Sequence, residues 1–454
     1  MTPATVGLGI VFLGLMLAVS ALIRRRIRLL QRLHVPSAVV GGFVTLIAGP
    51  QVFGEGIFPP GVLDVWSTLP GLLINVVFAA LLIGQPLPSA RVLWESSAPH
   101  VISGMLYSCG QFAIASLAVL FVLGPYFGLP PEAGGLLEMS FSGGHGTVAG
   151  LEAQFRSQGV DELADLGLAL ATLSLAIGVV LGTVLVNRMR ARNEVAPASA
   201  SAGEEEDLDI GRVSHDINDP PVPAHVSGQS ALASAIMFIA IAIGLGIAIL
   251  EFLRWLEHRL FETGLLEYMP LFPLALVGGA LVQLLARPLG YEGGIDRRMV
   301  ADVGGAALDM LLISAIGTMS LEVIGKEIQS IMILAVLGTI WSVVVFIYIG
   351  PRMFPKDGLA HASADFGQSM GNVATGFVLV DMADPKAVTQ GRVGYAYKQL
   401  AYEPFFGGGV VTALAVPLIA MGGLPVFAAV TAFLTLIIGF WGIRRIRAVA
   451  ATAK

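Results

Sequence analysis

The chain has 454 residues, of which 55% are hydrophobic and only 13% are charged, and its mean hydropathy is +0.80. A soluble globular chain carries roughly 25% charged residues, so this composition excludes an ordinary soluble domain and indicates a polytopic membrane protein. The net charge of −6 says little, because most of the excess acid lies in one loop, and we expect no nucleic-acid partner. The single Cys109 excludes an intramolecular disulfide.

The first apolar run, from about Val6 to Ile23, has no basic residue before it and three arginines after it. We therefore expect a first spanning helix with its N-terminus outside, and not a cleavable signal peptide. A spanning helix needs about 20 apolar residues, and on that rule the sequence predicts an all-α fold with about eleven transmembrane helices. The expected spans are 5–23, 36–53, 68–85, 100–124, 165–187, 230–250, 270–287, 303–320, 329–350, 396–420 and 424–442.

Basic residues support one orientation of these spans. The segments expected on the cytoplasmic side hold clusters such as Arg188/Arg190/Arg192, whereas the outer loops hold fewer, with Arg254 and Arg259 as the main exceptions. This agrees with the positive-inside rule and predicts a multi-pass protein of the cell (inner) membrane with a cytoplasmic C-terminus.

A polar, acidic segment rich in Pro, Ala and Ser separates five spans from six. It is typical of a disordered cytoplasmic linker, in which His215 and His225 are more simply solvated than metal-bound. The expected domains are a first repeat (1–190), this linker (191–228), a second repeat (229–422), and an extra C-terminal span with a basic tail (423–454).

The two halves resemble each other. "PSAVVGGFVTLI" and "PLALVGGALVQL" each carry a Gly-Gly pair five residues after a proline, at Gly41-Gly42 and Gly278-Gly279. The third spans and a later G-x-V-A string match in the same order. Five spans per copy is an odd number, so the second copy would enter the membrane from the opposite side, as in inverted-repeat transporters. Alternatively, the glycine pairs only let helices approach closely.

The segment after the sixth span, Glu251–Tyr268, places Phe252, Trp255 and Leu260 opposite charged residues. This pattern predicts an amphipathic helix at the outer membrane interface, either an arm between domains or a simple connector.

Two glycine-rich segments interrupt the apolar pattern. One contains "SFSGGHGTVAG" (140–150), and the other reads "HASADFGQSMGNVATGFVLVDMADP" (361–385). We interpret them as re-entrant hairpins, 129–150 and 361–382, which meet near the middle of the membrane. Irregular backbone at that depth is tolerated only when it is buried in protein or lines a cavity, so these segments predict a binding site.

Hydroxyls and carbonyls suit a hard cation such as sodium, and amides at a half-helix N-terminus suit a carboxylate. His145 could donate to a bound carboxylate, carry a proton, or order the hairpin through backbone contacts. The expected substrate-binding residues are Ser142, Gly143, Gly144, His145, Gly146, Thr147 and Thr375; the expected sodium-binding residues are Asn75, Ser140, Asp309, Ser369, Gly371 and Asn372.

Other intramembrane polar residues are functional candidates by default. Asn75 and Asp309 occupy similar places in the third spans, where they serve an ion, a substrate or a structural hydrogen bond. Lys398 and Glu403 could form a local pair. Further polar residues in or beside the spans are Gln111, Asp365 and Asp381, the last two of which could lie in solvent.

At "FSGGHGT" the sequence resembles the bacterial sodium/glutamate symporters. "HVPSAVVGG", the first hairpin and the paired Phe405-Phe406 carry the same resemblance, which covers most of the chain. It implies inverted repeats with glycine-rich re-entrant loops, sodium-coupled uptake of glutamate, and a homodimer whose core moves against a scaffold by elevator-like alternating access.

The second half departs from the family pattern. The second hairpin keeps Gly367, Gly371 and Thr375 but lacks the family's proline, and Gly408 and Val411 stand where the family has an Asp-x-x-Asn string. Ser37 replaces a glutamate of the first half. Glutamate itself is therefore less firmly implied than a small carboxylate.

The leading hypothesis is a sodium-coupled symporter for glutamate or a related small carboxylate. The alternative is the same architecture carrying another organic anion or solute, or one driven by protons through His145 or Asp309. We expect that the protein is not an enzyme, because the sequence has no paired intramembrane carboxylates, no H-E-x-x-H motif and no nucleophile elbow. It also has no P-loop, which argues against an ATP-driven pump. We expect sodium as coupling ion, no other metal or cofactor, and a lipid bilayer as surroundings.

Overall fold

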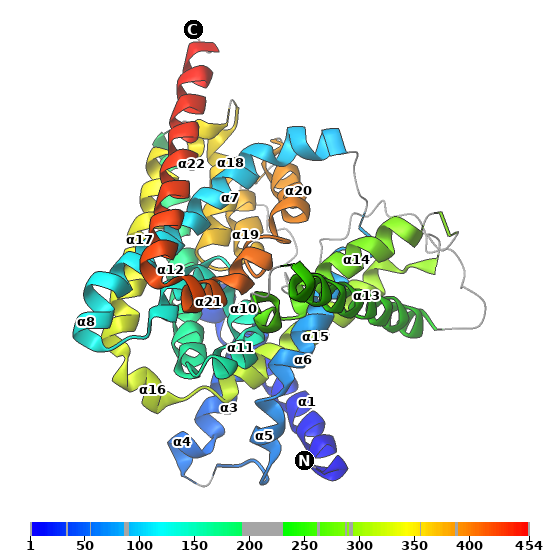
Figure 1. Ribbon diagram of the computed structural model, residues 1–454. Coiled ribbons are helices and arrows are strands. Elements are labelled where there is room, and N and C mark those ends of the chain that lie inside the picture. Colours follow the sequence, from blue (N-terminus) through cyan, green and yellow to red (C-terminus); the bar gives the residue numbers. More distant parts are fainter. Residues whose placement is uncertain are drawn as a thin grey trace. The chain divides into compact units, whose positions relative to one another are not determined.

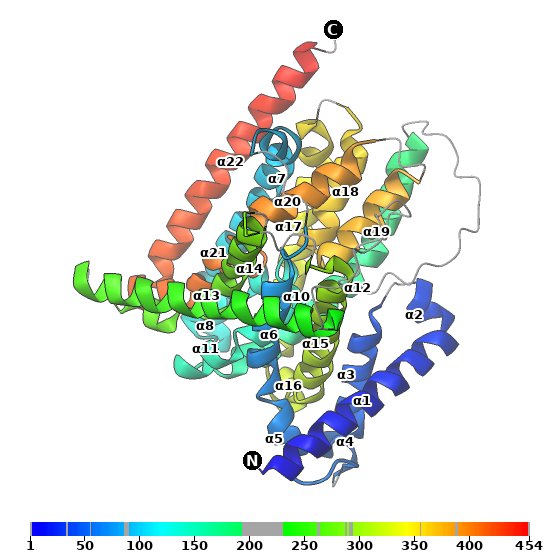
Figure 2. The same cartoon turned by 90° about the vertical axis from the view of Figure 1, so that its right-hand side faces the viewer.

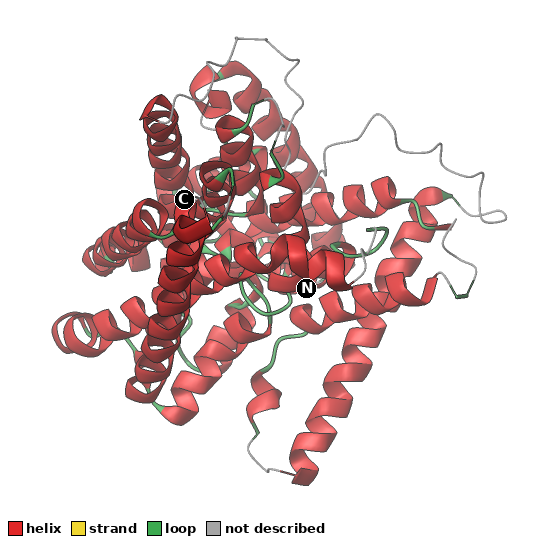
Figure 3. Ribbon diagram, turned by 90° about the horizontal axis from the view of Figure 1, so that it is seen from above, coloured by secondary structure: helices red, strands yellow, loops and turns green. Residues whose placement is uncertain are grey.

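The computed structural model describes residues 2–32, 35–54, 56–85, 90–192, 230–260, 264–286, 288–289, 294–354, 356–385 and 389–452. In these ranges the chain forms helices joined by loops (Figure 3). Eight of the described helices are long and apolar enough to span a membrane, and four more are apolar but shorter. The polytopic all-α fold is thus confirmed. The expected linker 191–228 lies outside the described residues, except for the first two, which end a helix.

The chain folds into two compact units, and each unit takes helices from both halves of the sequence. Unit 1 comprises the described parts of residues 1–87, 149–164 and 208–321, and unit 2 those of residues 88–148, 165–207 and 322–454. The compact units therefore cut across the expected repeats, whose boundaries stay a prediction.

Six helices make up most of unit 1. Two of them, α6 and α15, pack against each other in its centre, and the other four, α1, α3, α13 and α14, pack around this pair. Its small core gathers Ala79, Ile83, Phe238, Ala275 and Val300 from α6, α13, α14, α15 and the turn after α6. The elements of this unit are α1 (Pro3–Arg26), α2 (Arg28–Arg32), α3 (Ser37–Ala48), α4 (Pro50–Phe53), α5 (Val62–Trp66), α6 (Leu69–Ala80), α11 (Glu152–Ser157), α13 (Ala231–Leu260), η3 (Leu265–Tyr268), α14 (Phe272–Ala286) and α15 (Arg297–Gly317).

The two Gly-Gly pairs occupy matching places in unit 1. A Cβ on Gly41 would lie 3.0 Å from Ser20 of α1, and one on Gly42 would lie 2.6 Å from Ile316 of α15. A Cβ on Gly278 or Gly279 would likewise overlap a carbonyl oxygen, of α13 and α6 respectively. Both pairs allow close helix approach, as their sequence predicted; α3 lies against α1, and α14 against α13 (Figure 2).

Unit 2 contains the second glycine-rich segment, the first one up to residue 148, and the C-terminal helix, which runs along α7 (Figure 1). Each glycine-rich segment forms two short helices separated by a break. The elements are α7 (Ala90–Ala118), the π-helix η1 (Val119–Leu123), α8 (Gly124–Phe127), η2 (Pro131–Gly135), α9 (Leu136–Phe141), α10 (Gly144–Gly150), α12 (Glu162–Arg192), α16 (Leu321–Lys326), α17 (Ile328–Tyr348), η5 (Gly350–Met353), α18 (Gly358–Ser369), α19 (Val373–Ala383), α20 (Gly391–Tyr402), α21 (Val410–Gly422) and α22 (Leu424–Thr452).

The prediction of a continuous span over 396–420 is wrong. The helix ends at Tyr402 and resumes at Val410, and Gly407 and Gly408 have φ of 67° and 116°. These backbone angles favour glycine and cannot continue an α-helix. We call residues 403–409 the unwound segment.

Two other expected spans are made of shorter helices: 36–53 contains the 12-residue α3 and the 4-residue α4, and 270–287 contains the 15-residue α14. The expected amphipathic helix does not stand alone either. Residues 251–260 continue α13 without a break, although Phe252 and Trp255 are exposed as the pattern predicted.

Candidate functional site

The first hairpin is α9 and α10 with a break at Ser142–Gly143. Gly144 starts α10 with φ of 72°, a left-handed conformation that L side chains rarely adopt. The amides of Ser142 and Gly143 both donate to the carbonyl of Glu138, 3.0 Å away, which closes the end of α9. The glycines at this tip therefore serve a sharp turn between two helices.

The second hairpin is α18 and α19 with a break at Met370–Asn372. Asn372 has extended backbone and caps α19, since its Oδ1 accepts from the Thr375 amide at 2.9 Å and from the Thr375 hydroxyl at 3.2 Å. Ser369 Oγ donates to the carbonyl of Phe366 at 2.9 Å. The tip thus presents a capped helix N-terminus next to a glycine, Gly371.

The two tips meet inside unit 2. A Cβ built on Gly144 would lie 3.0 Å from the carbonyl oxygen of Gly371, so only glycine lets the backbones approach this closely. Gln111 of α7 joins them, because its Nε2 donates to the Ser369 carbonyl at 2.8 Å and its Oε1 accepts from Ser142 Oγ at 2.7 Å. One buried side chain therefore holds both breaks in register.

The unwound segment lies against the first hairpin. Glu138 Oε1 accepts from the Gly407 amide, from Thr412 Oγ1 and from Ser108 Oγ, each at 3.1 Å. The Thr147 hydroxyl donates to the Gly407 carbonyl at 3.3 Å. The Glu138 carboxylate thus accepts from a backbone amide that has no partner within a helix, because the helix is broken there.

A second buried carboxylate connects three helices of unit 2. Asp365 Oδ1 lies 3.0 Å from Lys398 Nζ and 3.1 Å from His100 Nδ1, and His100 Nε2 lies 2.7 Å from His361 Nδ1. The Lys398 ammonium also lies 4.5 Å from the ring centre of Tyr402, a cation–π contact. Lys398 and Asp365 are at most 1% exposed, so each requires the other.

Several alternatives left open by the sequence are thereby resolved. Lys398 bonds to Asp365, whereas Glu403 accepts from Gln368 Nε2 at 2.9 Å. Asp365 does not lie in solvent, while Asp381 is partly exposed and pairs with Arg392.

Most of the expected site residues gather around the two tips. His145 is 6% exposed, and its Nε2 lies 2.9 Å from Thr172 Oγ1 of α12. Ser140 faces its own helix, donating to the Leu136 carbonyl at 2.7 Å. Within unit 2 lie Ser140, Ser142, Gly143, Gly144, His145, Gly146, Thr147, Ser369, Gly371, Asn372 and Thr375.

The other two expected sodium ligands are Asn75 and Asp309. Both are on helices of unit 1, α6 and α15. Asn75 Nδ2 donates to the Gly71 carbonyl at 2.8 Å, and its Oδ1 has no hydrogen-bond partner among the described residues. Their expected role in the same sodium site as the hairpins stays a prediction.

The sequence reasoning missed Glu138, Ser108 and Thr412. A glutamate between apolar residues, in "LLEMSF", is the signal that could have found the first, because ionisable residues in membrane segments are functional candidates. The string "EPFFGGGV", with one proline and three glycines, likewise marks the unwound segment.

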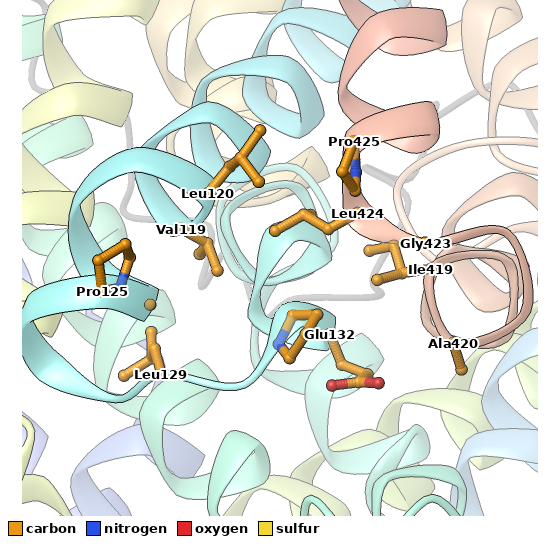
Figure 4. Close-up of a pocket in the computed structure, with 12 residues that line it drawn as sticks. Val119, Leu120, Pro125, Leu129, Glu132, Ile419, Ala420, Gly423, Leu424 and Pro425 are labelled. Atoms are coloured by element: carbon orange, nitrogen blue, oxygen red, sulfur yellow. The ribbon is translucent and has the colours of Figure 1, made fainter.

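A pocket lies elsewhere in unit 2, where η1 and the chain that follows it face α21 and the start of α22. Figure 4 shows apolar side chains around it and the carboxylate of Glu132 at its edge. None of the tip residues lines this pocket. In the described part of the chain, no group of three or more His, Cys, Asp or Glu is arranged to hold a metal ion.

Comparison with curated proteins finds no match. A family model described as sodium/glutamate symporter matches residues 72–383, about two thirds of the chain, and covers both hairpins but not the unwound segment. The match agrees with the resemblance read from "FSGGHGT" and with the helical membrane architecture. The chain therefore belongs to the sodium/glutamate symporter family, a family of membrane transporters.

Proposed function

We propose that the protein takes up glutamate or a related small carboxylate together with sodium by elevator-like alternating access. The observation that carries the proposal is the meeting of two helix–break–helix hairpins at Gly144 and Gly371, with Gln111 bonded to both. Broken helices that face each other are the usual binding-site construction of secondary transporters. Family membership supports the same reading.

In the proposed site the carboxylate binds at the tips, to Ser142, Gly143, Gly144, His145, Gly146, Thr147 and Thr375. The α19 N-terminus supplies partial positive charge, although the Asn372 side chain occupies one of its amides. Sodium binds to oxygens of Ser140, Ser369, Gly371 and Asn372, and in the wider proposal to Asn75 and Asp309.

We further propose that unit 2, which holds both hairpins, carries the solute, that the hairpins are re-entrant, and that the two halves are inverted repeats. The N-terminus is outside, the C-terminus is cytoplasmic, and the protein is a homodimer of the inner membrane. Cysteine labelling from each side of the membrane tests the orientation, and the mass of the solubilised protein tests the dimer.

Uptake of labelled glutamate into proteoliposomes tests the function. An inward sodium gradient should drive accumulation, whereas an equal potassium gradient should not. Absence of uptake of glutamate and of other small carboxylates, by protein that elutes as a single species, would refute the proposal.

Proton coupling is a second candidate, favoured by the buried chain of Asp365, His100 and His361. His361 is less buried than the other two, so the hydrogen bonds lead from an enclosed carboxylate toward the surface of unit 2. Accumulation driven by a pH gradient in the absence of sodium would favour this candidate over sodium coupling.

A further inference from the structure

The Glu138 carboxylate is fully buried, and its two oxygens have unequal surroundings. Oε1 accepts three hydrogen bonds, from the Gly407 amide, Ser108 and Thr412. Oε2 is buried and has no hydrogen-bond partner in the part of the chain that the structure describes. The three donors fix the position of the carboxylate, so Oε2 is held in place without a donor of its own.

Such an arrangement is costly for the protein alone. A buried polar atom without a partner loses its hydration and gains nothing in return, and a charged group loses more than a neutral one. Among the described donors, none reaches Oε2. A bound positive species at this oxygen would remove the cost.

The buried charges of unit 2 do not balance. Among its described residues, the buried carboxylates are Glu138, Asp365 and Glu403, whereas the only buried lysine or arginine is Lys398. Lys398 bonds to Asp365, at 3.0 Å. Glu138 is therefore left without a bonded cationic side chain, whereas Glu403 also lies in the field of the nearby Lys398.

Several further oxygen atoms lie near Gly407 and Ser108, two of the donors that bind Glu138. A Cβ built on Gly407 would lie 3.4 Å from the Ser142 carbonyl and 3.6 Å from Glu403 Oε2, so these oxygens flank the glycine whose amide binds Glu138. The Tyr402 hydroxyl lies 2.6 Å from Ser108 Oγ. Carboxylate, carbonyl and hydroxyl oxygens prefer hard cations, and unwound backbone in transporters coordinates sodium.

We infer that Glu138 Oε2 is a ligand of a sodium ion bound beside the unwound segment of unit 2. This inference rests on the proposed sodium coupling and adds a residue outside the sodium ligands proposed above. One monovalent cation balances the single negative charge of the Glu138 carboxylate. Glu403 meanwhile keeps its hydrogen bond to Gln368. The competing occupant of Oε2 is a proton, and the experiment separates the two.

The test is equilibrium binding of radioactive sodium to the purified full-length protein in detergent, at fixed pH and without substrate. Glu138→Gln keeps an acceptor oxygen for the three donors but removes the charge. We expect its sodium Kd to rise at least about tenfold, which corresponds to about 1.4 kcal/mol. The matched control is Glu322→Gln in the exposed α16, where Glu322 pairs with the exposed Lys326; its sodium Kd should equal that of the wild type.

Unchanged sodium binding by a folded Glu138→Gln protein would overturn the inference while leaving sodium coupling intact. If the wild-type protein binds no sodium, both the inference and the proposed sodium coupling are wrong. Uptake driven by a proton gradient would then test whether the protein transports carboxylates at all. If Glu138→Gln does not fold, an infrared difference spectrum of the wild type between sodium and potassium replaces it. A sodium-dependent shift of a carboxylate band supports the inference, whereas a protonated carboxyl band in both salts overturns it.

Discussion

Gly144→Ala should abolish most transport while leaving the fold intact. The substitution places an L side chain at φ of 72°, which costs about 1–2 kcal/mol. Its Cβ would also lie 3.0 Å from the Gly371 carbonyl, so the tips must separate by a few tenths of an ångström. Since 1.4 kcal/mol is a factor of ten, and only correctly joined tips bind solute, we expect uptake to fall by roughly tenfold or more.

The assay is initial uptake in proteoliposomes, normalised to inserted protein, beside the thermal midpoint in detergent. Gly159→Ala and Gly128→Ala are matched controls, because these glycines have φ of 72° and 77° but a Cβ there meets nothing within 4 Å. Both controls suffer the same backbone strain and should transport normally. If Gly144→Ala transports as well as they do, the approach of the tips has no part in binding.

Three further substitutions probe the same unit. Asn372→Ala removes the cap of α19, so it should cost about 1 kcal/mol of stability and raise the sodium concentration for half-maximal uptake; an unchanged sodium dependence would remove this residue from the ion site. Lys398→Met removes the ammonium partner of the buried Asp365 carboxylate and leaves it the His100 contact, so it should destabilise by about 3–5 kcal/mol, and adding Asp365→Asn should restore most of the thermal midpoint. Gln111→Ala removes the side chain that bonds to both hairpins and should lower uptake severalfold and stability by about 1–3 kcal/mol, whereas Gln329→Ala on the exposed face of α17 should change neither.

The helical architecture and the hairpins could be predicted from local patterns. Apolar length identified the long helices, and "SFSGGHGTVAG" identified the break at Ser142 and Gly143, because a run of glycines and hydroxyls in an apolar chain has few structural uses. The break at Gly407–Gly409 was equally legible. We predicted a continuous span there because hydropathy was averaged over about 20 residues. In such an average the apolar residues on either side hide the three glycines.

Pairings between distant residues could not be predicted in this way. The His100–Asp365 contact joins residues 265 positions apart, and only the packing of α7 against α18 and α20 brings them together. Neither hydropathy nor spacing encodes which buried charge meets which. The role of Gln111 could not be predicted either. It depends on two hydrogen bonds to separate hairpins, and its neighbours in the sequence do not indicate them.

The mixing of both sequence halves within each compact unit has a consequence for how the protein is made. In unit 1, α3 and α6 pack against α15, which is completed about 240 residues after the end of α6. At roughly 5–20 residues per second of synthesis, the early helices wait on the order of ten to fifty seconds for their partner. During that interval a nascent chain exposes the glycine surface of α3 to the translocation machinery and to lipid. Insertion chaperones should therefore engage this protein early, and two separately translated fragments divided between α12 and α13 should regain a shared native structure only when they are present together.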